Sequence, residues 1–186
     1  MISTIDTPRG SIAIRPTREE DVAAYRELRL EALRTHPEAF GATYEENLAR
    51  PIERWQQNVR DGAGTDLGIT YVAEAAGALA GMTGIYRDNS AKMGHRATIW
   101  GVYMRPGWRG AGIADALIGA CVSWAHQQRL RLVTLSVVTT NAAAIRCYVR
   151  CGFSVYGVDP EVIYHDGVYY DELLMMRHLG PDKMTR

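Results

Sequence analysis

Among the features of this sequence, a run of small residues between an apolar strand and an amphipathic helix places the strongest restriction on the fold. Residues 96–104 (RATIWGVYM) have strand-like composition, and residues 107–114 (GWRGAGIA) follow with three glycines. Apolar residues then recur at helical spacing: Ile113, Leu117, Ala120, Cys121 and Trp124. Free amides at the start of such a helix point at one spot, and the helix dipole adds positive charge. The segment suits a pyrophosphate, although a tight turn whose glycines only relieve strain explains it equally well.

Two common phosphate-binding motifs are excluded by the residues of this loop. No Gly-Lys-Ser/Thr follows the glycines, which disfavours the loop of nucleotide triphosphatases. The dinucleotide fingerprint needs a third glycine at position 115, which is Asp115 here.

The remaining periodicity predicts the order strand, two helices, three strands, helix, strand, helix and then strands. A capping box of Thr17 and Glu20 begins a helix to about residue 35, and Pro51 begins a second helix. Asn141 is expected to cap a fourth helix, after the one that follows the glycine-rich run, and this helix ends near Gly152. The other predicted strands are 12–15, 69–75, 79–86, 132–138, 153–157, 161–164 and 168–176, with turns at 76–77 and 165–167. This order predicts an α/β domain built on a mixed sheet.

Composition narrows the functional classes. Hydrophobic residues make up 47% and charged residues 23%, which excludes a disordered chain. Lys+Arg and Asp+Glu both number 21, so the chain lacks the basic excess of nucleic-acid-binding proteins, and we expect no nucleic acid partner. No stretch approaches the roughly 20 apolar residues of a membrane span, and the polar residues 1–11 do not resemble a signal peptide. We therefore expect a cytoplasmic protein with no membrane partner.

The three cysteines are Cys121, Cys147 and Cys151. An odd number without an export signal predicts reduced thiols. Cys147 and Cys151 stand four residues apart on a predicted helix and would supply half of a metal site. Because no second pair of ligands stands at suitable spacing, we favour packed apolar thiols and expect no metal.

A second segment, residues 140–153 (TNAAAIRCYVRCGF), follows the buried strand 132–138. Together the two segments closely resemble the GCN5-related N-acetyltransferase (GNAT) superfamily. The family's loop pattern is matched by Arg109, Gly112 and Ala114, and its downstream pattern by Asn141, Ala144, Tyr148, Gly152 and Phe153. A looser likeness covers residues 28–40, which look like the substrate-side helix and loop of some members.

The resemblance implies the acyl-CoA N-acyltransferase fold. This is a mixed, mostly antiparallel central sheet with a splayed parallel strand pair, flanked by helices. The splayed strands would be 96–104 and 132–138. We expect one N-acetyltransferase domain over residues 12–179, with an N-terminal lead-in at 1–11 and a C-terminal tail at 180–186.

The resemblance also implies acetyl-CoA as the acetyl donor. The pantetheine arm would pair with the main chain of Val102, Tyr103 and Met104 as an added strand. Asn141 would hydrogen-bond the same arm, and Arg109 would order the loop. The pyrophosphate would lie on the amides of Gly110, Ala111, Gly112, Ile113, Ala114 and Asp115.

The implied reaction is acetyl transfer to a primary amine by direct attack in a ternary complex, since no cysteine stands where an acetyl-enzyme would form. Main-chain amides near Tyr103 and Met104 would stabilise the oxyanion, and Tyr148 matches the family's general acid. The carboxylate that many relatives place on a central strand is missing. Open candidates for the general base are Glu45, Glu46, Glu74, His95, Tyr103, Glu172 or a water chain to a remote carboxylate.

Two other functional classes compete with the enzyme. The missing carboxylate favours a domain that binds acetyl-CoA as a non-catalytic sensor or regulatory module. A structural domain without a ligand requires both motifs to be coincidental. The acceptor amine and any preference for another acyl-CoA stay open. Trp100 and Trp108 flank the predicted cleft, and the closing hairpin, with Tyr164, His165, Asp166, Tyr169 and Tyr170, would hold specificity or the edge of a homodimer.

Overall fold

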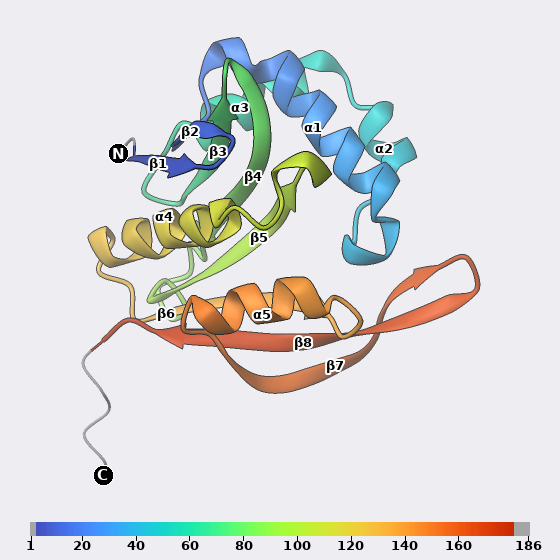
Figure 1. The fold of residues 1–186 in the computed structure, drawn as a ribbon. Helices are drawn as coiled ribbons and strands as arrows, with labels where there is room; N and C mark the ends of the chain where they lie inside the picture. Colours follow the sequence, from blue (N-terminus) through green and yellow to red (C-terminus); the bar gives the residue numbers. More distant parts are fainter. Residues whose placement is uncertain (1–2, 181–186) are drawn as a thin grey trace.

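The computed structural model describes residues 3–180 and shows an eight-stranded sheet with helices on both faces (Figure 1). The strands are β1 Ser3–Thr7, β2 Gly10–Pro16, β3 Gly68–Ala75, β4 Ala78–Arg87, β5 Arg96–Met104, β6 Leu132–Val138, β7 Ser154–His165 and β8 Val168–His178. The helices are α1 Val22–Thr35, α2 Tyr44–Leu48, α3 Ile52–Gly62, α4 Ile113–Gln127 and α5 Ala142–Arg150. None of the described helices is both long enough and apolar enough to cross a membrane.

The sheet has the order β1-β2-β3-β4-β5-β6-β8-β7. Every pair of neighbours is antiparallel except β5 and β6. The predicted fold class is therefore confirmed. The connection from β5 to β6 passes through the glycine-rich loop and α4, and α5 leads from β6 into β7.

Alternating side chains of the central strands divide the core into two layers. Val72 of β3 and Met82 of β4 pack on the α1 and α3 face, beside the buried Trp55. Ala73 and Ile85, on the same two strands, belong to the layer that α4 covers. The two-residue period of a strand produces this division, and it places α4 and α1 on opposite faces of the sheet.

Several predicted elements differ from the structure. Ser3–Thr7, within the predicted lead-in, forms a strand because its backbone pairs with β2. The short helix α2 escapes prediction, although Thr43 and Glu46 form its capping box. The predicted strands 153–157 and 161–164 are one long strand, β7, whose register shifts twice, so its side chains do not alternate regularly. Most of the predicted C-terminal tail lies outside the described residues.

The predicted capping box at Thr17 and Glu20 is wrong. The hydroxyl of Thr17 donates to the carbonyl of Val59 at 2.8 Å, which ties β2 to α3 instead. Asp21 accepts from the Arg18 amide at 2.7 Å and ends a short 3-10 turn, Glu19–Asp21, and α1 begins at Val22. The start of α1 therefore depends on Asp21.

A buried ion pair fixes this start to the sheet. Arg15 of β2, only 4% exposed, donates to both carboxylate oxygens of Asp21 at 2.7 and 2.8 Å and also to Glu74 of β3. Burial alone would raise the pKa of Asp21, but the hydrogen bonds from Arg15 and from the Arg18 amide outweigh it and lower that pKa.

We predict that Asp21→Asn destabilises the protein by about 3 kcal/mol at pH 7, because it leaves Arg15 short of a buried counter-charge. A lowered folded-state pKa means that ionised Asp21 stabilises the fold above its unfolded pKa of about 3.9, and that this stability disappears as the pH falls through the folded value. Urea denaturation at pH 7, 5 and 3 should show the gap to the wild type closing at the lowest pH.

The matched control is Glu20→Gln, one residue away, where an exposed carboxylate meets Arg18 at 3.9 Å. We expect this change to stay within about 0.5 kcal/mol at every pH. A difference for Asp21→Asn that is constant from pH 7 to pH 3 would contradict this account.

Candidate active site

The parallel strands β5 and β6 pair over only three residues before they separate. The last pair is Thr98 with Thr134, whose hydroxyl oxygens lie 3.1 Å apart. Beyond it, residues 99–104 of β5 pair with β4 alone, and residues 135–138 of β6 pair with β8 alone. In this part of the sheet, the edge of β5 that faces β6 and the edge of β6 that faces β5 are both unpaired.

A β-bulge bends β5 just beyond this point. The register between β4 and β5 shifts between Met82 and Gly84, so that two residues of β5 oppose Thr83. Gly101 has φ +66°, the left-handed conformation found in one class of β-bulge, and the Thr83 hydroxyl donates to the Trp100 carbonyl at 3.3 Å. A bulge increases the bend and twist of its strand, which directs the end of β5 away from β6.

A cleft of about 1150 Å³ fills the gap between the strands. Residues 98–104 of β5 and 135–138 of β6 line its floor, and the glycine-rich loop, α5 and α1 with the turn after it line its walls. A cavity of this size exceeds the range of pockets for small ligands, about 300–1000 Å³, and suits an extended one. Trp100 and Trp108 both lie on its wall, as predicted.

The glycine-rich loop presents a row of free backbone amides. Gly110 and Gly112 have φ +79° and +75°, and α4 begins at Ile113. Among the described residues, the amides of positions 110–115 have no hydrogen-bond acceptor, and Gly112 offers no capping side chain. The 15-residue helix adds the positive end of its dipole. The loop can therefore hold an anionic group such as a phosphate on its main chain.

Arg109 ties this loop to the end of β5. Its Nε donates to the Met104 carbonyl at 3.1 Å, and its Nη2 donates to Nε2 of His36 at 2.8 Å. The guanidinium also lies 6.0 Å from the centre of the Tyr103 ring. Arg109 thus brings positive charge to the loop and connects it to the turn after α1.

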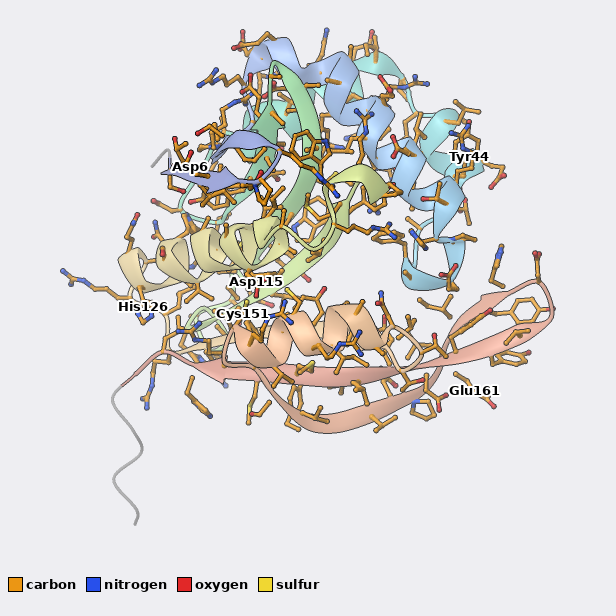
Figure 2. All side chains as sticks on the ribbon, viewed as in Figure 1. Asp6, Tyr44, Asp115, His126, Cys151 and Glu161 are labelled. Atoms are coloured by element: carbon orange, nitrogen blue, oxygen red, sulfur yellow. The ribbon has the colours of Figure 1, made fainter. Side chains whose placement is uncertain are left out.

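The side chain of Asp115 joins α4 to α5. Arg150 donates two hydrogen bonds to its carboxylate, both at 3.0 Å, and Figure 2 shows Asp115 facing Cys151 across the two helices. The thiol of Cys147 lies 3.7 Å from the same carboxylate. Arg150 neutralises a charge that would otherwise repel an anion on the loop.

The potential ligand atoms of Asp115, Cys147 and Cys151 lie within 4.8 Å of one another. Sequence analysis did not predict that Asp115 lies beside the two thiols. Both carboxylate oxygens already accept from Arg150, so this contact is consistent with packed thiols beside an ion pair. The absence of a metal remains a prediction.

Tyr148 lines the cleft from α5. The residue is only 5% exposed, and its ring packs edge-to-face on Phe153 with 6.4 Å between centres. Its hydroxyl makes no hydrogen bond to any described residue. Burial raises the pKa of Tyr148, so the phenol keeps its proton at neutral pH. The side chain can therefore act as a proton donor.

Asn141 is the N-cap of α5, as predicted. Its Oδ1 accepts from the Ala144 amide at 3.1 Å, and the residue lines the cleft. Because the cap uses the oxygen, the side-chain NH₂ group is the part of Asn141 available to a ligand.

The residues predicted to pair with pantetheine lie on the free edge of β5. Val102, Tyr103 and Met104 all line the cleft. The side chain of Tyr103 turns toward α1, where its hydroxyl donates to Glu31 at 2.9 Å, and Glu31 also accepts from Arg105 at 2.9 Å. This hydrogen bond occupies the phenol of Tyr103, so its main chain is the part that faces the gap.

The structure separates the candidates for a general base. Glu74 pairs with Arg15, Glu46 caps α2, and His95 precedes β5 and does not line the cleft. Glu45 lines a separate pocket of about 390 Å³ between the turn after α1 and β7. Glu172 of β8 lines the cleft itself and forms no ion pair with the described residues.

Sequence analysis missed the cleft residues that come from α1 and the turn after it. Arg29, His36, Glu38 and Phe40 line the α1 side of the cleft, where His36 accepts from Arg109 of the glycine-rich loop. His36 lies 3.5 Å from Glu38, and Phe40 also lines the smaller pocket together with Tyr164 and His165 of the closing hairpin. The looser likeness of residues 28–40 to a substrate-side helix was the available signal.

Comparison with known proteins agrees with this geometry. The acetyltransferase (GNAT) family matches residues 22–153. The chain is 31% identical over 116 residues, 62% of this chain and 67% of the relative, to the L-methionine sulfoximine/L-methionine sulfone acetyltransferase of Pseudomonas aeruginosa. It is 27% identical to the L-amino acid N-acetyltransferase AaaT of Escherichia coli K12, over 90% of this chain and 98% of the relative.

The fold matches solved structures as well. The yncA protein of Salmonella typhimurium, solved with its cofactor acetyl-CoA, superimposes with a TM-score of 0.79 at 19% identity, over 94% of this chain and 98% of that one. Because the family pattern spans more than half of the chain and includes both predicted motifs, this chain belongs to the acetyltransferase (GNAT) family, enzymes that transfer an acetyl group from acetyl-CoA.

Proposed function

We propose that the cleft between β5 and β6 binds acetyl-CoA and that the enzyme acetylates the primary amine of a small, amino-acid-like acceptor. The observation that carries this proposal is the unpaired edge of β5, which is joined by residues 105–109 to the row of free amides at positions 110–115. The edge of β5 suits an extended chain that carries amide groups, and the free amides of the loop suit the phosphates at the end of that chain. The names of the two relatives, both acetyltransferases of amino acids or their analogues, support the acceptor class.

The described contacts assign a task to each part of the chain. Val102, Tyr103 and Met104 would offer main-chain partners to the pantetheine amides, and Asn141 would donate from its NH₂ group. The amides of Gly110, Ala111, Gly112, Ile113, Ala114 and Asp115 would bind the pyrophosphate. Arg109 holds the loop in place, and Arg150 removes the repulsion from Asp115.

Acetyl-CoA supplies a thioester whose carbonyl carbon an amine attacks and whose sulfur then departs. Main-chain amides near Tyr103 would stabilise the oxyanion that forms before the C–S bond breaks. Tyr148 would give its phenolic proton to the departing thiolate. Glu172, directly or through water, would accept the proton of the acceptor ammonium.

A non-catalytic acetyl-CoA sensor was the alternative favoured by the missing carboxylate on β5 and β6. Glu172 of β8 supplies a carboxylate at the cleft from a neighbouring strand, and the curated relatives are named as acetyltransferases. Both observations favour an enzyme over a non-catalytic sensor. A homodimer, the absence of nucleic acid and metal partners, and a cytoplasmic location stay predictions.

We predict that Gly112→Ala raises the Kd for acetyl-CoA at least tenfold in isothermal titration. An alanine at φ +75° is strained by about 1–2 kcal/mol, and its methyl group would stand beside the amides that face the phosphates. Gly107→Ala is the matched control, since Gly107 has ordinary φ and open space around its Cα. Equal affinities for the two variants would contradict a pyrophosphate site on this loop.

We predict that Tyr148→Phe lowers kcat tenfold or more, about 1.4 kcal/mol of barrier, because the thiolate must leave without a proton donor. The Kd for acetyl-CoA should change less than twofold, because the ring and its packing on Phe153 remain. Tyr156→Phe, on the exposed surface of β7, serves as control. An unchanged kcat would remove Tyr148 from the mechanism.

We predict that Glu172→Gln lowers kcat/KM for the acceptor at least tenfold at pH 7, when the amine is almost entirely protonated. The deficit should shrink as the pH rises toward the pKa of the amine, because solvent then supplies the neutral form. A pH profile of kcat/KM measures this, with the exposed Glu161→Gln as control. A deficit that is the same at every pH would exclude a role for Glu172 as base.

A further inference from the structure

Arg29 brings an uncompensated positive charge to the α1 side of the cleft. It stands on α1 and lines the cleft beside Phe40, Tyr86 and Trp100. Its Nη1 is fully buried and has no hydrogen-bond partner among the described residues, and no described carboxylate lies within ion-pair distance of its guanidinium. A guanidinium keeps its charge inside proteins, and buried charges are normally paired.

The guanidinium is held in place by packing. It lies over the ring of Phe40, 4.8 Å from the ring centre, a cation–π contact that orients its plane. Burial lowers the pKa of Arg29, and the charge of Arg50 acts in the same direction. The charged form of Arg29 is therefore energetically unfavourable in these surroundings unless an anion binds to it.

We propose that Arg29 binds the carboxylate of an α-amino acid acceptor. This inference rests on the proposed function and names the group that selects its substrate. A guanidinium matches a carboxylate with two parallel hydrogen bonds, which fixes orientation as well as affinity.

The distance between Arg29 and the end of β5 fits the distance between the carboxylate and the amine of an α-amino acid. A Cβ added at Gly101, on the bulge of β5, would stand 3.9 Å from its Nη1. The amine nitrogen and the carboxyl carbon of an α-amino acid are about 2.5 Å apart. A carboxylate on Arg29 therefore leaves its amine beside residues 101–104, where the thioester is expected. The acceptor side chain would point past Phe40 toward the smaller pocket, which shares that residue.

A negative charge, that of Glu172, is available for the ammonium group of the acceptor. Glu172 lines the same cleft without an ion pair among the described residues, so a zwitterion would find one partner for each of its charges. An amine without a carboxylate would leave Arg29 unpaired. The cleft should therefore discriminate against it.

The test compares each of the protein L-amino acids with its amide, which keeps the amine and side chain but lacks the carboxylate. Release of CoA gives kcat/KM, and isothermal titration gives the Kd for acetyl-CoA. The wild type should prefer the best acid over its amide at least tenfold. Arg29→Met should lower kcat/KM for the acid about 100-fold and leave the amide within threefold, with the Kd for acetyl-CoA unchanged.

Two further variants make the result specific. Arg29→Lys keeps the charge but loses the two-pronged contact, so it should recover part of the preference for the acid. Arg26→Met, one turn earlier on α1, removes an arginine that donates to the Leu48 carbonyl at 3.3 Å and does not line the cleft, so it should change neither ratio. Should Arg29→Met fail to fold, Arg29→Lys and the acid-to-amide ratio of the wild type still decide the question.

A wild type that acetylates amides as well as acids, or an Arg29→Met variant that keeps the preference, would overturn the proposal. Equal losses on acid and amide would show a merely structural role and would overturn it too. Transfer to no amine at all, despite binding of acetyl-CoA, would instead refute the proposed function.

Discussion

The site depends on the point where two parallel strands stop pairing. At Thr98 and Thr134 the hydroxyl groups meet at 3.1 Å, and Thr134 also donates to the Ala97 carbonyl at 3.3 Å. Beyond them the bulge at Gly101 bends β5 away. A sheet normally hides its edges, so an internal gap with two free backbone edges is costly unless a ligand pairs with them. The protein keeps the gap open by holding β5 through β4 and β6 through β8.

Main-chain groups and neutralised charges prepare one end of this gap for an anion. The amides of positions 110–115 have no acceptor within the described chain, and α4 adds its dipole. The carboxylate of Asp115 stands in the first turn of the same helix, where it would oppose a phosphate, and Arg150 pairs with it. This arrangement explains how a chain with no net charge can prepare a place for a strongly anionic cofactor.

Sequence reasoning succeeded where the signal is local. The glycine loop and the cap at Asn141 each lie within a continuous segment whose spacing indicates them, and the resemblance to the family singled out Tyr148 within the second segment. It failed where the outcome depends on distant partners. β1 is a strand only because it pairs with β2, and the Thr17 hydroxyl is drawn away by Val59. The isolation of Arg29 and the placement of Glu172 follow from strands and helices that are far apart in the chain.

Residue-resolved amide hydrogen exchange with and without acetyl-CoA tests the central claim most directly. If the cofactor pairs with the free edge of β5 and with the glycine-rich loop, amides within residues 99–104 and 110–115 gain protection on binding, and those of the β1–β2 hairpin do not change. Binding that leaves residues 99–104 as exchangeable as before, with protection elsewhere, would contradict the assignment of the gap between β5 and β6 as the acetyl-CoA site.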